Sequence, residues 1–317
     1  MYSIIIPLYN KADYIEMALN SVLSQTFKDF ELIIINDGST DNSFEVLTKF
    51  DFKAIDYQII NQVNAGVSTT RNNGVKFAKY SYIAFLDADD WWEPTFLEEM
   101  SNLIFDFPDA GIYGSGYYIV KGNIRSEDTI GVDKKFNRGI INYCEVYAKT
   151  LCMPLWTGAT IVKKKVFEHE NGFKPNLKMG EDFDLWIRIA LKYPVALIKK
   201  PLSNYNQDVD IKARAVDYFK IYEPNSFFIF NLDYLSKSEA TNYDLKNLLD
   251  KLRAYSLLQY RIQNAHIEEY TKEIAKVNFK NIPLSTRLQY AFPSVIVRNW
   301  IKLKIIGVYY LKMILRK

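Results

Sequence analysis

The chain is 317 residues long, with 49% hydrophobic residues and a formal net charge of +3, so it can bury a full core in one or two domains. Its two cysteines, Cys144 and Cys152, and its two histidines form no CxxC or Cys/His cluster. This argues against a zinc site, a disulfide scaffold and a histidine-based triad. Met1 leads into an apolar run without a basic region, so the sequence predicts a cytoplasmic protein without a signal peptide.

Apolar runs alternate with helical patterns through the first part of the chain. Strands are expected at Ser3–Leu8, Phe30–Ile35, Ala54–Ile60 and 82–86, and helices at Lys11–Gln25, Ser43–Lys49 and Gly66–Lys79. This alternation predicts a parallel, doubly wound α/β sheet. The later patterns predict a helix from Pro94 to Phe107, strands at Ala110–Val120 and Gly158–Val162, a helix opening at Gly180, and long helices near 213–235 and 243–276.

Three carboxylates, Asp87, Asp89 and Asp90, follow the apolar run at 82–86. Like charges this close repel one another, and burial increases the cost. Mg²⁺ or Mn²⁺ would relieve it, because carboxylate oxygens are their preferred ligands. The alternative is that Asp90 or its neighbours cap a helix beginning at Trp91-Trp92-Glu93-Pro94.

Other polar residues follow the first two strands, and sheets of this class bind ligands beyond the carboxyl ends of their strands. Asp37 could accept the N–H of a pyrimidine base, Tyr9 could stack on it, and Arg71 could contact a phosphate. The structural alternatives are a turn or cap residue, a half-buried loop aromatic and a solvated helix residue, respectively. The sequence has no phosphate-binding glycine loop, which argues against P-loop enzymes and Rossmann dehydrogenases.

A second acidic cluster, Glu181, Asp182 and Asp184, opens the helix after Gly180. Acidic residues suit a helix N-terminus because of the helix dipole, and Asp184 is spaced to pair with Arg188. The same dipole keeps a carboxylate ionised, so one of these residues could serve as a general base.

Together these motifs resemble the inverting glycosyltransferases of family 2, over roughly residues 1–205. The motifs, in chain order, are Ser3-Ile4-Ile5-Ile6-Pro7-Leu8-Tyr9-Asn10, Ser24-Gln25-Thr26-Phe27, Phe30-Glu31-Leu32-Ile33-Ile34, Asn36-Asp37-Gly38-Ser39-Thr40-Asp41, Asn64-Ala65-Gly66-Val67-Ser68 with Arg71-Asn72, Leu86-Asp87-Ala88-Asp89-Asp90 and Gly180-Glu181-Asp182-Phe183-Asp184-Leu185-Trp186. The resemblance implies a GT-A fold, which is a Rossmann-like mixed sheet flanked by helices. It also implies a catalytic domain at 1–212 and a mostly helical region at 213–317.

The resemblance assigns roles to the nucleotide-binding residues. The residue matching Asp37 reads the base, with Pro7 and Tyr9 in the same pocket, and the residue matching Arg71 lies near the base and diphosphate. The segment matching Asp87-Ala88-Asp89 contacts the ribose and a divalent cation, Mg²⁺ or Mn²⁺. Asp90 competes with Asp89 for the metal role.

The resemblance also assigns the general base to the Glu181-Asp182 pair, and we favour Asp182 over Glu181. Two positions depart from the family pattern. Asn36 stands where the family usually has Asp, and after Tyr205 the Arg and His of many relatives are missing. Lys212 and Arg214 come later, so the cation that closes over the diphosphate is not assigned.

The function implied is transfer of a sugar from a nucleoside diphosphate, most readily UDP, to a hydroxyl of a glycan or lipid-linked acceptor in cell-surface glycan synthesis. Trp156 is the candidate acceptor-stacking residue, and core packing is the expected role for most of Tyr113, Tyr117 and Tyr118. The alternatives are a non-catalytic sugar-nucleotide-binding protein and a sugar nucleotidyltransferase. The latter would carry a glycine-rich basic loop after the first strand.

The C-terminal segment is basic. Residues 274–317 contain nine lysines and arginines and no acidic residue. Charges within the apolar stretch Ile296–Leu315 argue against a membrane span, and Arg298, Lys302, Lys312 and Arg316 fall on one side of a helix. We expect residues 287–317 to lie on an anionic membrane surface, with a packed C-terminal helix as the alternative. A nucleic-acid partner is not expected, because no recognition motif is present.

Overall fold

The computed structural model describes residues 1–209, 220–301 and 303. By its internal contacts the chain divides into two compact units, Met1–Ala215 and Val216–Lys317. The predicted domain boundary at 212–213 lies outside the described residues and remains a prediction. Lys212 and Arg214 also lie outside the described residues.

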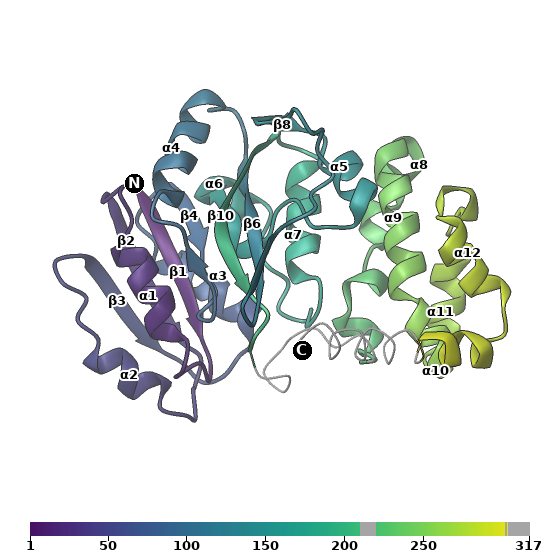
Figure 1. The fold of residues 1–317 in the computed structure, drawn as a ribbon, viewed down its shortest axis with the longest axis horizontal. Coiled ribbons are helices and arrows are strands. Elements are labelled where there is room, and N and C mark those ends of the chain that lie inside the picture. Colours follow the sequence, from purple (N-terminus) through teal and green to yellow (C-terminus); the bar gives the residue numbers. More distant parts are fainter. Residues whose placement is uncertain (210–219, 302, 304–317) are drawn as a thin grey trace. The chain divides into compact units, whose positions relative to one another are not determined.

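In the described part of the first unit, ten strands form one sheet in the order β3-β2-β1-β4-β9-β6-β10-β5, with β7 beside β6 and β8 beside β10 (Figure 1). The strands are β1 (Tyr2–Leu8), β2 (Phe30–Asn36), β3 (Asp56–Asn61), β4 (Tyr82–Phe85), β5 (Trp91–Trp92), β6 (Ile112–Lys121), β7 (Ile124–Glu127), β8 (Arg138–Ile141), β9 (Thr160–Lys163) and β10 (Val195–Asn206).

The sheet is mixed, as the GT-A resemblance implies, and the parallel order predicted from strand–helix alternation is confirmed for the first four strands. Strands β3, β2, β1 and β4 run parallel, with Ile5 of β1 opposite both Ile33 and Phe85. From β4 onward, β9 is antiparallel to both β4 and β6. The alternation of strands and helices is regular only up to β4. Within this half β1, β2 and β4 are buried, which explains their continuous apolar runs, whereas β3 is largely exposed.

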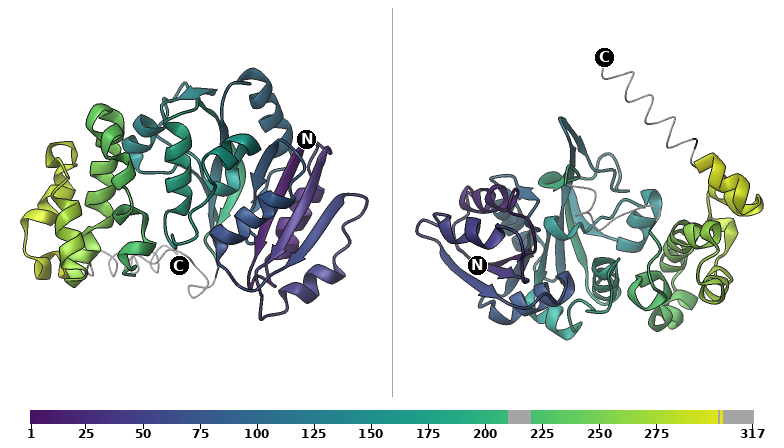
Figure 2. Two further views of the ribbon diagram at one scale, coloured as in Figure 1. Left: turned by 180° about the vertical axis from the view of Figure 1, so that it is seen from behind. Right: turned by 90° about the horizontal axis from the view of Figure 1, so that it is seen from below.

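Helices cover both faces of this sheet (Figures 1 and 2). They are α1 (Ile15–Leu23), α2 (Ser43–Lys49), α3 (Val67–Phe77), α4 (Phe96–Asp106), α5 (Tyr143–Thr150), α6 (Lys164–His169) and α7 (Glu181–Ala190). Ile4 and Ile6 of β1 share one core cluster with residues of α1, α2 and α4. On the other face, a Cβ at Gly74 of α3 would lie 2.5 Å from Ile5 Cγ2, so glycine permits this close approach.

The interpretation of Asp90 as a helix cap is wrong. Trp91–Trp92 is the short strand β5, which pairs antiparallel with β10, and α4 begins only at Phe96 after the N-cap Thr95. Trp92 is buried, and its Nε1 donates to the Gly158 carbonyl at 2.6 Å. This hydrogen bond and the packing of the tryptophan outweigh the local helix signal of Glu93 and Pro94.

The described part of the second unit is helical. Its elements are 3-10 turns at Pro224–Ser226, Phe228–Phe230, Asp233–Leu235 and Phe279–Asn281, and the helices α8 (Ser236–Thr241), α9 (Tyr243–Ser256), α10 (Leu258–Gln263), α11 (Ile267–Ile274) and α12 (Leu284–Ala291), followed by helical residues 294–301. A long helix is absent from the described residues of 213–235, and left-handed Asn264 divides the 243–276 stretch.

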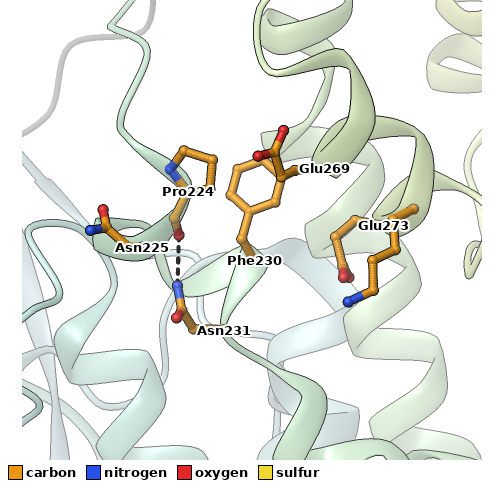
Figure 3. A pocket seen from close by; sticks show the side chains of 7 residues that line it. Pro224, Asn225, Phe230, Asn231, Glu269 and Glu273 are labelled. Atoms are coloured by element: carbon orange, nitrogen blue, oxygen red, sulfur yellow. Dashed lines mark hydrogen bonds between the residues drawn. The ribbon is translucent and has the colours of Figure 1, made fainter.

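A pocket of about 160 Å³ lies within this helical unit. Phe230 and Pro224 supply apolar surface, and Glu269 and Glu273 project from α11 at its edge (Figure 3). The Asn231 amide donates to the Pro224 carbonyl at 2.7 Å, which ties the 3-10 turns together.

The basic segment is described only in its first part. Val297 and Ile301 are buried against Leu258 and Ile262 of α10, and Arg298 donates to the Ile262 carbonyl. Most of the predicted cationic side, Lys302, Lys312 and Arg316, lies outside the described residues. Within the described ranges, no helix has the length and apolarity needed to cross a bilayer.

Candidate active site

The carboxyl ends of β1, β2 and β4 lie at one edge of the sheet, because these neighbouring strands are parallel. The Asp37 N–H donates to the Leu8 carbonyl at 2.8 Å, which joins the first two strand ends. Asn10 holds the next turn, since its Oδ1 accepts from the Thr40 N–H at 2.8 Å. Pro7 is half-buried in β1, whereas Tyr9 just beyond the strand is 46% exposed.

Asp37 is buried and holds the start of α3. Its Oδ1 accepts from Gln62 Nε2 at 2.7 Å and from the Ala65 N–H at 2.8 Å, and its Oδ2 accepts from the Gly66 N–H at 3.0 Å. The structural role considered for Asp37 is therefore real. A carboxylate offers about four acceptor positions, so one remains on Oδ2.

Arg71 of α3 is buried, so its interpretation as a solvated helix residue is wrong. Its guanidinium donates to Asp87 Oδ1 at 2.6 Å and to Glu181 Oε1 at 3.2 Å, and it lies 5.4 Å from the Phe173 ring. Although burial opposes its charge, Asp87 and Glu181 raise the pKa of Arg71. Its Nε is buried without a hydrogen-bond partner among the described residues.

The first acidic cluster is divided among different partners. Asp87 pairs with Arg71, whereas Asp89 Oδ2 accepts from Lys11 Nζ at 2.6 Å. Burial raises the pKa of Asp89 although Lys11 opposes the shift. Both carboxylates are half-buried, so both retain access from solvent.

These two carboxylates fit a divalent cation of the Mg²⁺ or Mn²⁺ type. In the described residues no group of three or more His, Cys, Asp or Glu side chains converges on one point. Mg²⁺ is usually held by only one or two carboxylates together with substrate phosphates. Asp89 and Asp87 would hold the ion.

Asp90 has other partners and joins two other segments of the chain. It is 1% exposed; its Oδ1 accepts from the Asn206 N–H at 2.8 Å, and its Oδ2 accepts from Trp156 Nε1 at 3.3 Å. Burial, followed by the charges of Asp89 and Asp87, raises the pKa of Asp90 well above its usual value. These contacts tie Asp90 to the end of β10 and to Trp156, and the choice between Asp89 and Asp90 as metal ligand stays a prediction.

Trp156 is half-buried beside the site, and its ring lies 4.1 Å from that of Tyr205 at the end of β10. Two other aromatics have the expected core role. Tyr113 is fully buried and donates to the Phe107 and Ala110 carbonyls, and Tyr117 is 4% exposed. Tyr118 is half-buried and lies 3.6 Å from the Arg125 guanidinium.

The carboxylates of the second acidic cluster have different surroundings. Helix α7 begins after left-handed Gly180, and Asp184 is fully buried between Lys174 at 2.7 Å and Arg188 at 2.8 Å. Asp182 has weaker partners: its Oδ1 accepts from the Phe183 N–H, and its Oδ2 lies 3.5 Å from Thr157 Oγ1. Desolvation, and then the charge of Glu181, raises the pKa of Asp182 to about 7.

The structure thus brings the predicted residues of both acidic clusters to one place, because Arg71 contacts Asp87 and Glu181 directly. Two further residues, Lys11 and Thr157, contact carboxylates of the candidate site and were not predicted from the sequence. Lys11 directly follows the first strand-end motif, so its position was a usable signal. For Thr157 the sequence offered no such signal beyond its place in the loop next to Trp156.

The fold is an α/β sheet with acidic residues at the ends of its parallel strands, and the comparisons with known proteins identify its family. Residues 3–169 match the family model described as Glycosyl transferase family 2. An uncharacterized glycosyltransferase of Rickettsia felis is 33% identical in an alignment of 249 residues that covers 74% of this chain. The match covers 38% of that relative, so the chain spans about two fifths of its length.

Two solved structures share the fold. TarS 1–349 of S. aureus, in complex with UDP, has a TM-score of 0.68 and 17% identity over 91% of this chain and 82% of that chain. The mannosyltransferase PcManGT of Pyrobaculum calidifontis, in complex with GDP-Man and Mn²⁺, has a TM-score of 0.57 and 17% identity over 96% and 84% of the two chains. The chain has the GT-A fold and belongs to glycosyltransferase family 2.

The raised pKa of Asp182 makes a prediction about stability. The folded protein holds this proton up to about pH 7, whereas an unfolded aspartate releases it near its ordinary value of 3.8. The wild type therefore loses stability as pH rises from about 4 to about 7. Asp182→Asn cannot ionise, so its melting temperature should exceed that of the wild type at pH 8, and the gap should shrink towards pH 4.

Thermal melts of the two proteins at several pH values measure this difference. Asp184→Asn is the contrasting variant, because it breaks two buried ion pairs and should be destabilised at pH 8. A gap between Asp182→Asn and the wild type that is the same at pH 4 and pH 8 would contradict the assignment.

Proposed function

We propose that the protein is an inverting glycosyltransferase that moves a sugar from a nucleoside diphosphate, in the first place UDP, to an acceptor hydroxyl. The observation that carries this proposal is the bridge made by Arg71. Its guanidinium connects Asp87, at the donor-binding strand end, with Glu181, next to the candidate base Asp182. A donor at the strand ends would therefore lie beside a carboxylate able to take a proton.

In the proposed reaction the acceptor oxygen attacks the anomeric carbon as the bond from that carbon to the diphosphate oxygen breaks. The hydroxyl proton passes to a carboxylate oxygen of Asp182, and the diphosphate leaves with the bonding electrons. One displacement inverts the anomeric centre. With a pKa of about 7, Asp182 is a stronger base than an ordinary aspartate and is still half ionised at neutral pH.

The donor site would use the residues at the strand ends. The remaining acceptor position on Asp37 would take a base N–H, with Tyr9 stacked on the base and Pro7 beneath it. A Mg²⁺ or Mn²⁺ ion on Asp89 and Asp87 would stabilise the charge that develops on the diphosphate. Similar solved structures hold UDP, UDP-GlcNAc and GDP-Man with Mn²⁺, which supports a nucleotide-sugar donor.

The acceptor proposed is a sugar hydroxyl of a glycan or a lipid-linked saccharide. The ring of Trp156 supports this acceptor, because it is half-buried and packs against Tyr205. Trp156 also directly precedes Thr157, whose hydroxyl contacts Asp182. An aromatic face suits the apolar face of a sugar ring. The alternative of a non-catalytic sugar-nucleotide-binding protein predicts donor binding without turnover.

A peripheral membrane position is proposed for the C-terminal segment. Exposed apolar side chains follow one another there: Leu284, Leu288, Phe292, Val295, Ile296, Trp300 and Leu303. Arg287 lies in the same segment, and every charged residue of that segment is basic. Apolar insertion combined with attraction to anionic lipid would hold the protein next to a lipid-linked acceptor.

The base assignment predicts a large loss of rate. Asp182→Asn should lower kcat by a factor of about 10² or more, because the acceptor proton loses its carrier. In the wild type, kcat/KM should fall tenfold per pH unit below about pH 7, where Asp182 is protonated. Stopped assays of nucleoside diphosphate release over pH 5 to 9 measure both effects.

Glu181→Gln is the matched control for that assay. It removes the negative charge beside Asp182, so the acid limb of its pH profile should shift to lower pH while turnover persists. If Glu181→Gln abolished turnover and Asp182→Asn did not, Glu181 would be the base.

Donor binding should depend on a divalent cation. Isothermal calorimetry with UDP-sugars should show binding in Mn²⁺, and EDTA should abolish turnover, because the ion that Asp89 and Asp87 would hold would no longer offset the charge of the diphosphate. GDP-sugars serve as the comparison for base selectivity. Full turnover in EDTA would contradict the proposed role of the metal ion. Equal affinities for GDP-sugars and UDP-sugars would contradict the proposed preference for UDP.

The membrane proposal predicts cosedimentation with vesicles that contain phosphatidylglycerol, and little with phosphatidylcholine alone. High salt should release the protein. Val295→Ser should weaken vesicle binding, whereas Ile124→Ser, at a similarly exposed apolar residue of β7, should not. Equal recovery of the protein with both kinds of vesicle at low salt would end the proposal.

A further inference from the structure

The two cations of the candidate donor site are held in different ways. Arg71 is buried and contacts two carboxylates at once, so its guanidinium is fixed. Lys11 contacts one carboxylate, Asp89, and its side chain is 15% exposed. A lysine ammonium is a point charge on a flexible stem, so it can change partners where a forked guanidinium cannot.

The backbone of Lys11 is nevertheless fixed. Its N–H donates to Ser43 Oγ at 2.8 Å, and its carbonyl accepts from the N–H groups of Tyr14 and Ile15 at 3.0 Å each. Any change of partner therefore involves only the four-carbon side chain. The ammonium stays within side-chain reach of the strand end that carries Asp89.

The contact between Lys11 and Asp89 conflicts with a metal on the same carboxylate. A divalent cation bound to Asp89 would lie within a few ångström of the ammonium, where like charges repel strongly. The diphosphate of a donor reverses this, because its oxygens offer the ammonium a new anionic partner.

We propose that Lys11 is an exchangeable counter-cation of the donor site, which neutralises Asp89 when no donor is bound and transfers to a diphosphate oxygen when the donor arrives with its metal. This inference rests on the proposed function. A metal ion that binds alone must displace Lys11 from Asp89, so its affinity is low. When nucleotide and metal bind together, each raises the affinity of the site for the other. By linkage the two affinities are coupled to the same extent in both directions.

The test uses isothermal calorimetry on the full chain with Mn²⁺ alone, and with UDP at saturating Mn²⁺. Lys11→Met keeps the side-chain length but removes the charge. It should bind Mn²⁺ alone about tenfold more tightly, and should bind UDP in Mn²⁺ about tenfold to a hundredfold more weakly, the range of one charge-assisted hydrogen bond.

Two further variants separate the charge effect from a folding effect. Lys11→Arg restores a cation, so it should recover most of the UDP affinity and keep the weak binding of Mn²⁺ alone. Lys49→Met removes an exposed lysine whose partner, Glu45, is an exposed residue of the same helix. This variant should bind both ligands like the wild type. The melting temperature of each variant confirms folding.

The proposal is overturned if Lys11→Met binds Mn²⁺ alone no more tightly than the wild type, or if its UDP affinity stays within twofold of the wild-type value. A wild type that binds no UDP would instead contradict the donor chemistry proposed above. In that event, tighter Mn²⁺ binding by Lys11→Met would still support competition for Asp89, and unchanged Mn²⁺ binding would refute it.

Discussion

The candidate site depends on one buried cation. Arg71 compensates Asp87 and Glu181, which come from a strand end and a helix start about a hundred residues apart in the chain. Without it, several partly buried carboxylates would face one another, and breaking a buried ion pair typically costs about 3–5 kcal/mol. The close approach of α3 to β1 at Gly74 brings this arginine to the strand ends, so backbone packing and site electrostatics are linked.

Elements whose causes are local could be predicted from the sequence. The apolar runs of β1, β2 and β4 and the helix α2 have near-identical bounds in the structure, because their patterns reflect burial of the strands on both faces and one apolar helix side. The strand-end residues Asp37 and Asp87 could also be found, since parallel strands end at one edge. The antiparallel pairing of β9 with β4 and β6 was expected only from the family resemblance, because local patterns do not record pairing between strands far apart in the chain.

The errors share a physical reason. Asp90 had a strong local cap signal, but its carboxylate accepts from Asn206 and Trp156, which are 116 and 66 residues away. Lys11 gave no sign in the sequence that its partner is Asp89, 78 residues further on. The segment after residue 219 had a helical pattern, yet the side-chain amide of Asn231 binds two carbonyls and ends the 3-10 turns early. In each case a polar side chain binds groups, distant or nearby in the chain, that the pattern of apolar residues does not record.

The position of Asp37 limits how a protein of this type can change its donor during evolution. The same carboxylate that would read the base also holds Ala65, Gly66 and Gln62, so a substitution chosen to suit a different base would loosen the start of α3 and displace Arg71. A change in base preference must therefore begin at freer positions such as the exposed Tyr9. The sugar moiety is not tied to this carboxylate in the same way. Lineages with this architecture should consequently diversify their sugars more readily than their nucleotides.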